Sequence, residues 1–141
     1  MSASEVVENL YEAIKSRDPD RIEQVSLAAY GPETTLTESD TLPWPGGVFR
    51  ARDLLANQVA RLRSEGATLI DWSQLDHSEL MVAPGAEEGV DHVFSVATAP
   101  LTADPEVRIR LLEWFTVRGT LIEKIEVFAG ETAAVLERMK A

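Results

Sequence analysis

The side chain best suited to chemistry in this sequence is a glutamate within residues 107–117, VRIRLLEWFTV. Alternate residues of an extended strand point to opposite faces, so one face here carries a single acid, Glu113, among apolar residues. A carboxylate on a buried face is costly unless it is protonated or paired. Glu113 is therefore either a pocket acid or, near a strand end, the partner of an arginine or a backbone amide. The apolar residues of this face are Val107, Ile109, Leu111, Phe115 and Val117.

Two further residues could act together with Glu113. Tyr11 lies on the apolar side of the first expected helix, where its hydroxyl finds a partner in the core or donates to a ligand. Glu38 ends a short expected strand directly before a proline-rich loop, which suits a pocket mouth and equally a solvated strand end. A base with two hydrogen-bond donors is the set needed for proton transfer next to a carbonyl group.

The other candidates would contact a ligand without chemistry. Ile109, Leu111 and Phe115 are expected to form an apolar wall around Glu113. Trp44 stands between two prolines and is a ligand platform or, as we favour, hydrophobic cover for the sheet. His92 is expected to be partly buried, because it shares its strand face with three apolar residues, and such a histidine is more often a core residue than a catalyst. These three are Val90, Phe94 and Val96.

Composition excludes several classes of function. The net charge of −11 repels nucleic acid and anionic lipid, so neither is an expected partner. Without cysteine and with only two histidines, the chain shows no disulfide framework and no metal-ligand spacing, and we expect neither metal nor cofactor. The first residues do not resemble a secretory signal and no apolar run is long enough to span a membrane, which predicts a cytoplasmic protein.

The elements that must position these residues begin with helices. Ser2 and Glu5 resemble a capping box before a helix that runs to about Ser16. Asp18 and Pro19 predict the start of a second helix, which ends before Gly31-Pro32. A strand over 33–38 and a loop over 39–47 precede a third helix over about 50–64, and Gly66 terminates it.

The second half of the chain changes toward a period of two. Turn signals divide it into four long antiparallel strands over about 67–82, 89–98, 106–117 and 120–128, followed by a short helix from Glu131 to Lys140. The predicted fold class is α+β, a single domain over 1–141 in which three N-terminal helices wrap a curved, antiparallel, mixed-edge sheet and enclose an apolar pocket.

This order of elements resembles the nuclear transport factor 2-like superfamily and its SnoaL-like branch. The similar segments are VENLYEAIKSRDPDRIEQV, LPWPGGVFRARDLL and EWFTVRGTLIEKIEVFAGETAAVLE, and the resemblance covers nearly the whole chain. It implies a cone-shaped fold, a pocket between helices and sheet, and a homodimer packed through the sheet. Members include ketosteroid isomerases, polyketide cyclases, epoxide hydrolases, dehydratases and plain binding domains, so the fold does not fix a reaction.

Alignment with the ketosteroid isomerases sharpens the residue argument. It places Tyr11 at their oxyanion tyrosine, Glu113 at their protonated acid, and Glu38 at or beside their general base, a system that is a worked example of carboxyl groups tuned by their environment. Glutamate at both carboxylate positions departs from that pattern. The SnoaL-like cyclases resemble a histidine–aspartate arrangement for which His92 has no evident acidic partner, and the arginine between two aspartates of limonene-type epoxide hydrolases has no counterpart.

Three hypotheses follow for the activity. The chain is an acid–base isomerase or cyclase acting on a small carbonyl compound, with Glu38 as base and Tyr11 and Glu113 as oxyanion donors. Alternatively, the pocket binds an apolar small molecule without chemistry. As a third reading, the outward sheet face around Trp114 is a dimer or partner surface, compatible with either of the others.

Overall fold

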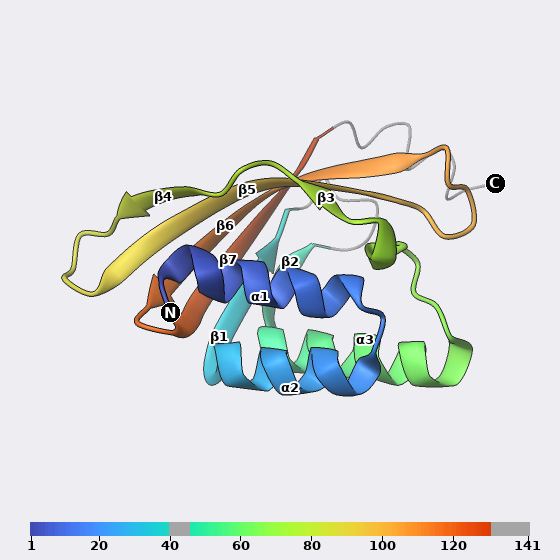
Figure 1. The fold of residues 1–141 in the computed structure, drawn as a ribbon, viewed down its shortest axis with the longest axis horizontal. Coiled ribbons are helices and arrows are strands. Elements are labelled where there is room, and N and C mark those ends of the chain that lie inside the picture. Colours follow the sequence, from blue (N-terminus) through green and yellow to red (C-terminus); the bar gives the residue numbers. More distant parts are fainter. Residues whose placement is uncertain (40–45, 131–141) are drawn as a thin grey trace.

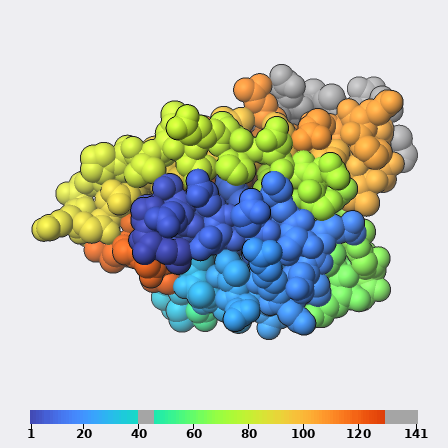
Figure 2. All heavy atoms as spheres, in the orientation of Figure 1, coloured from blue at the N-terminus to red at the C-terminus, as the bar shows by residue number. Residues whose placement is uncertain are grey.

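The computed structural model describes residues 1–39 and 46–130. Three helices, α1 (Ala3–Lys15), α2 (Pro19–Ala29) and α3 (Ala51–Glu65), lie together on one face of a curved sheet (Figure 1). The blue atoms of α1 and α2 form a continuous layer over this side of the molecule (Figure 2). The predicted α+β class and the helical covering of the sheet are confirmed.

Local signals set the helix ends as expected. The Ser2 side chain accepts from the Glu5 amide while the Glu5 side chain accepts from the Ser2 amide, so the capping box is complete. The Asp18 side chain accepts from two backbone amides at the start of α2, where Pro19 needs no donor. Gly66 ends α3 at φ 72°, a left-handed conformation open to glycine at little cost.

The sheet has seven strands in the order β2-β1-β7-β6-β5-β3, with β4 also paired to β5. Only β1 and β7 run parallel among the described pairs, which makes the sheet mixed. The strands are β1 (Tyr30–Glu38), β2 (Gly47–Arg50), β3 (Asp76–His77), β4 (Met81–Pro84), β5 (Val90–Pro100), β6 (Arg108–Arg118) and β7 (Leu121–Gly130).

The prediction of a long strand over 67–82 is wrong. Ile70 makes one isolated bridge to Leu101, and Trp72–Gln74 then forms a short 3-10 helix, η1. The Asp71 side chain accepts from the Ser73 amide, which fixes a turn where the residue pattern favoured extended chain. The short strands β3 and β4 follow this turn and pair with different parts of β5.

The buried face of β6 is the predicted one, but the buried face of β5 is not. Ile109, Leu111, Phe115 and Val117 are buried on β6, as expected. On β5 the small residues Ser95, Ala97 and Ala99 face the core, because α1 packs against this strand and small side chains allow a close approach. The larger Phe94 and Val96 therefore lie on the outer face, together with His92.

Candidate functional site

Tyr11 and Glu113 meet inside the molecule. The Tyr11 hydroxyl on α1 donates a hydrogen bond to Glu113 Oε1 on β6, with 2.9 Å between the two oxygens. Tyr11 is buried at 2% exposure, whereas Glu113 keeps part of its surface accessible. The structure thus brings together two residues that are 102 positions apart in sequence, and the carboxyl group has a tyrosine partner where an arginine or a backbone amide was the alternative.

Burial and this hydrogen bond set the protonation behaviour of the pair. Burial raises the pKa of Glu113 from 4.5 to about 7, against the opposing effects of the Tyr11 hydrogen bond and of the charge on His77. Burial and the negative charge of Glu113 raise the pKa of Tyr11 well above its usual range. Glu113 can therefore hold or release a proton near neutral pH, whereas Tyr11 stays a hydrogen-bond donor.

His77 is a neighbour of the pair that the sequence does not point to. Its ring centroid lies 4.8 Å from that of Tyr11, and its Nδ1 is 2.7 Å from the Ser78 carbonyl oxygen. A carbonyl oxygen only accepts, so Nδ1 carries the proton in this bond. His77 pairs with Ala97 on β5, and only that strand register, invisible in the sequence, places it beside Tyr11.

The pair borders an apolar cavity of about 470 Å³ between the helices and the sheet. Such a volume lies within the roughly 300–1,000 Å³ typical of sites for small organic molecules. Its apolar lining comes from α1, α3, β6 and β7 and includes Leu10, Ile14, Leu55, Leu111, Phe115 and Ile125. Its polar lining from α1, α2, β1 and β6 includes Tyr11, Ser26, Tyr30, Glu38 and Glu113.

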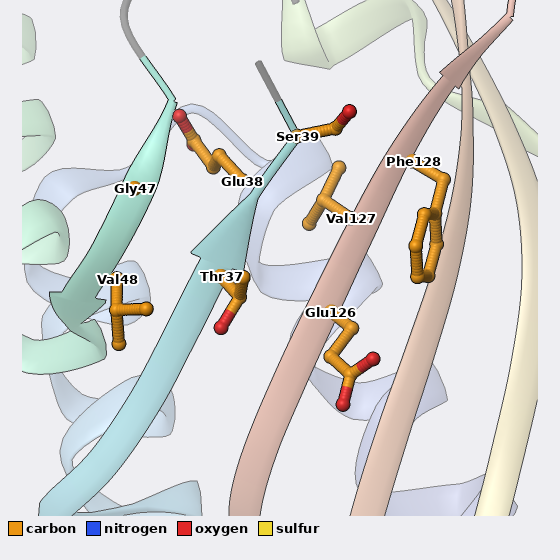
Figure 3. Close-up of a pocket in the computed structure, with 8 residues that line it drawn as sticks. All are labelled: Thr37, Glu38, Ser39, Gly47, Val48, Glu126, Val127 and Phe128. Carbon is orange, nitrogen blue, oxygen red and sulfur yellow. The ribbon is translucent and has the colours of Figure 1, made fainter. Parts of the chain in front are cut away.

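Glu38 lines the same cavity from the end of β1. Glu38 is in register with Val127 of β7, and Val127 is in register with Glu113 of β6. At a strand spacing of about 4.8 Å, the two glutamate backbones stand about 10 Å apart. The Glu38 side chain extends from β1 toward the beginning of β2 (Figure 3). Glu113 is held by Tyr11, whereas Glu38 lies on the other side of Val127 from this pair.

Glu38 also borders a second hollow, of about 400 Å³, along β1, β2 and β7 (Figure 3). Its carboxylates are Glu38 and Glu126, and Glu126 is paired with Lys124 at 2.6 Å. An ion pair of this kind is ordinary at a surface, so this hollow carries no chemical signal comparable with the buried pair. Its lining is Thr37, Glu38, Ser39, Gly47, Val48, Glu126, Val127 and Phe128.

The predicted ligand-binding residues differ in whether they line the cavity. Leu111 and Phe115 line the cavity, while Ile109 is buried in the core but is not part of the lining. His92 lies on the outer sheet face, away from the cavity, where its Nδ1 accepts from Trp114 Nε1 at 2.9 Å. The prediction that His92 contacts a ligand in the pocket is therefore wrong. Trp44 and the helix predicted from Glu131 to Lys140 lie outside the described residues.

Two cavity residues were missed because they lie where the sequence indicates only an ordinary helix and its end. Ser26 is within α2, and Tyr30 directly precedes the turn-forming pair Gly31-Pro32, yet Tyr30 begins β1. Burial, and then the charge of Glu113, raise the pKa of Tyr30 above its usual range. Tyr30 is thus electrostatically coupled to Glu113.

Comparison with solved structures identifies the fold. A protein of unknown function from Burkholderia pseudomallei, described as NTF2-like, is 16% identical and matches over 100% of both chains with a TM-score of 0.63. A protein with a ketosteroid isomerase-like fold from Catenulispora acidiphila, in complex with trimethylamine, matches over 90% of this chain and 86% of its own, with 12% identity and a TM-score of 0.58. The fold is nuclear transport factor 2-like.

Other findings limit what this nuclear transport factor 2-like fold implies. TerC, crystallised with polyporic acid, matches over 98% of each chain at 13% identity with a TM-score of 0.61. No protein-family model and no curated protein sequence matches the chain. At such identities the similarity establishes the fold alone, and the SnoaL-like branch stays a prediction.

Residues 1–39 and 46–130 contain no group of three or more His, Asp or Glu side chains placed to hold a metal ion. None of the helices in these ranges is long and apolar enough to cross a lipid bilayer.

Proposed function

We propose that the chain is an acid–base isomerase or cyclase of the SnoaL-like type, acting on a small apolar carbonyl compound. The observation that carries this proposal is the partly buried Tyr11–Glu113 hydrogen bond at the wall of an apolar cavity. A carboxyl group with a pKa of about 7 and a tyrosine that stays protonated are two donors able to hold a carbonyl oxygen as it gains negative charge.

The proposed reaction begins when the Tyr11 hydroxyl exchanges its hydrogen bond to Glu113 for one to the carbonyl oxygen of the ligand, which also accepts a hydrogen bond from protonated Glu113. The Glu38 carboxylate removes a proton from the carbon next to the carbonyl, the electron pair of that C–H bond forms a carbon–carbon double bond, and the carbonyl π pair moves to oxygen. In a substrate with a β,γ double bond the enolate is a dienolate, and return of the proton from Glu38 to its γ carbon re-forms the carbonyl group, moves the double bond into conjugation and completes an isomerisation. Attack of the enolate carbon on a second carbonyl, with that oxygen taking the proton, closes a ring instead.

Glu38 must reorient for this role. Its side chain extends toward β2 and has to turn back across Val127 to reach a ligand held at Glu113 (Figure 3).

Hydrogen–deuterium exchange at the α-carbon of 2-tetralone, followed by ¹H NMR in D₂O, tests the proposal without a known substrate. We expect Tyr11→Phe to slow catalysed exchange by about 10²-fold or more, because one oxyanion donor is lost. We expect Glu38→Gln to slow it by about 10²- to 10⁴-fold, because the base is lost. Ser64→Ala, at an exposed helical serine outside the cavity, is the control. Exchange at buffer rate in the wild type would refute catalysis on this ketone class.

A second candidate function is binding of a carbonyl compound without chemistry. It is favoured by the direction of the Glu38 side chain, since binding needs only the donors Tyr11 and Glu113. In this case ketone affinity falls in Tyr11→Phe, stays unchanged in Glu38→Gln, and no exchange accompanies binding.

We also propose a homodimer packed through the outer face of the sheet. Leu112 and Phe128 are 40% and 42% exposed there, although both belong to long, central strands. Trp114 and Phe94 stack beside them with ring centroids 5.5 Å apart. An apolar area of this kind marks an interaction surface. Light scattering should show a dimer for the wild type and a monomer for Leu112→Asp, and a wild-type monomer at high concentration would contradict the proposal.

A further inference from the structure

Two hydroxyl groups on the helical side of the cavity lack a hydrogen-bond partner. Ser26 is fully buried at 0% exposure, and no described residue bonds its Oγ. The Tyr30 hydroxyl also has no partner in the described part of the chain, although its backbone carbonyl accepts two bonds from Arg52. Both residues line the cavity.

The two residues are neighbours at the end of α2. The Tyr30 amide donates to the Ser26 carbonyl, so they are one helical turn apart, and residues four apart share a helix side. They belong to the helical wall and its junction with β1, whereas Glu113 belongs to the sheet wall. Polar groups thus lie on both walls of the cavity, and apolar side chains such as Leu55 and Leu111 also belong to its lining.

An unpartnered buried hydroxyl costs free energy that a ligand oxygen can recover. We propose that Ser26 and Tyr30 form a second polar subsite of the cavity, which binds a second oxygen of the ligand while the carbonyl oxygen is held at Tyr11 and Glu113. The proposal rests on the function proposed above and narrows its substrate class to apolar carbonyl compounds with a second oxygen function, a hydroxyl, carbonyl or ether.

Three pairs of aryl ketones of increasing length test this subsite. Each pair consists of a plain ketone and its analogue with a distal hydroxyl: acetophenone and 4′-hydroxyacetophenone, 2-acetylnaphthalene and 2-acetyl-6-hydroxynaphthalene, 4-acetylbiphenyl and 4-acetyl-4′-hydroxybiphenyl. Affinities are measured by NMR titration of the wild type, of the double variant Ser26→Ala/Tyr30→Phe, and of Ser64→Ala as the matched control.

For the pair of fitting length, the hydroxyl should raise wild-type affinity by about five-fold or more, as one added hydrogen bond does. The double variant should reduce this gain to about two-fold or less while binding the plain ketone as the wild type does. Ser64→Ala should keep the gain. The subsite is overturned if the affinity gain from the hydroxyl persists in the double variant. It is also overturned if the gain is absent at all three lengths while the plain ketones bind. Both outcomes leave the proposed function unaffected. Failure of all six ketones to bind the wild type counts against both.

The melting temperature, measured without ligand, distinguishes a ligand-binding role of Ser26 from a structural role. If Ser26 Oγ has no partner in the folded protein, Ser26→Ala removes a cost and should leave the melting temperature unchanged or raise it. A fall of about 4 °C or more would show that Ser26 makes a structural hydrogen bond, and would overturn its assignment to the subsite.

Discussion

Glu38 and Glu113 occupy one row of the sheet, on either side of Val127. Only Glu113 is held by Tyr11, so the two carboxyl groups have different surroundings although they line one cavity. Carboxyl groups in different surroundings are suited to opposite acid and base roles.

Shortening the arm of Glu38 should impair catalysis. Glu38→Asp keeps the charge but removes one methylene from a side chain that must cross Val127, and a misplacement of about 1 Å at a reacting group can cost about 10²-fold in rate. We expect deuterium exchange of 2-tetralone to slow by about that factor, with ketone affinity unchanged. Full activity in Glu38→Asp would argue that Glu38 is not the base.

The pKa of Glu113 should respond to its two neighbours in a fixed order. The Tyr11 hydrogen bond lowers this pKa more than the charge on His77 does, so Tyr11→Phe should raise it above about 7, and His77→Asn should raise it by less. Titration of ¹³C-labelled glutamate by NMR measures both shifts. A Glu113 pKa near 4.5 in the wild type would show a solvated carboxylate and would remove the basis of the proposed acid.

Stability should depend on pH through Glu113. Because the folded pKa is about 7 and the ordinary value is 4.5, the folded state holds this proton more tightly, and stability is lost as pH rises between those values. The loss is at most about 3.5 kcal/mol, since each pKa unit corresponds to about 1.4 kcal/mol. Urea unfolding at pH 4 and pH 8 should show that Glu113→Gln removes this pH-dependent loss. If the wild type and Glu113→Gln differed by the same unfolding free energy at pH 4 and at pH 8, this prediction would be contradicted.

Much of the fold could be predicted from local signals. The capping box at Ser2, the Asp18-Pro19 helix start and the Gly66 stop act within a few residues, and a sequence shows all of them directly. The alternation around Glu113 could also be predicted from the sequence, because a single acid on an apolar strand face is recognisable whichever element packs against that face.

The parts that could not be predicted depend on packing between distant elements. Hydrophobicity favoured Phe94 and Val96 as the core face of β5, but the approach of α1 selects the small Ser95 and Ala97 instead. Likewise, the position of His77 beside Tyr11 follows from strand register, which sequence spacing does not contain.

Removing His92 should leave the site intact, because the sheet separates it from the cavity. His92→Gln loses the hydrogen bond from Trp114 on the outer face, and we expect exchange of 2-tetralone to stay within about two-fold of the wild type, since no donor in the cavity changes. Its oligomeric state is measured in parallel, to separate an effect on the outer face from one on the site. A large loss of activity in a dimer of wild-type size would return His92 to the list of catalytic candidates.

Substitutions at two adjacent residues of β5 should show which face α1 covers. Ala97 is 1% exposed on the core face, so Ala97→Leu forces extra carbon atoms against packed side chains and should cost about 1–3 kcal/mol of unfolding free energy. Thr98 faces outward, where Thr98→Leu removes only an exposed hydrogen bond with Arg108 and should change stability by about 0.5 kcal/mol or less. Urea unfolding measures both. Equal losses at the two positions would mean that α1 does not pack against β5 as described.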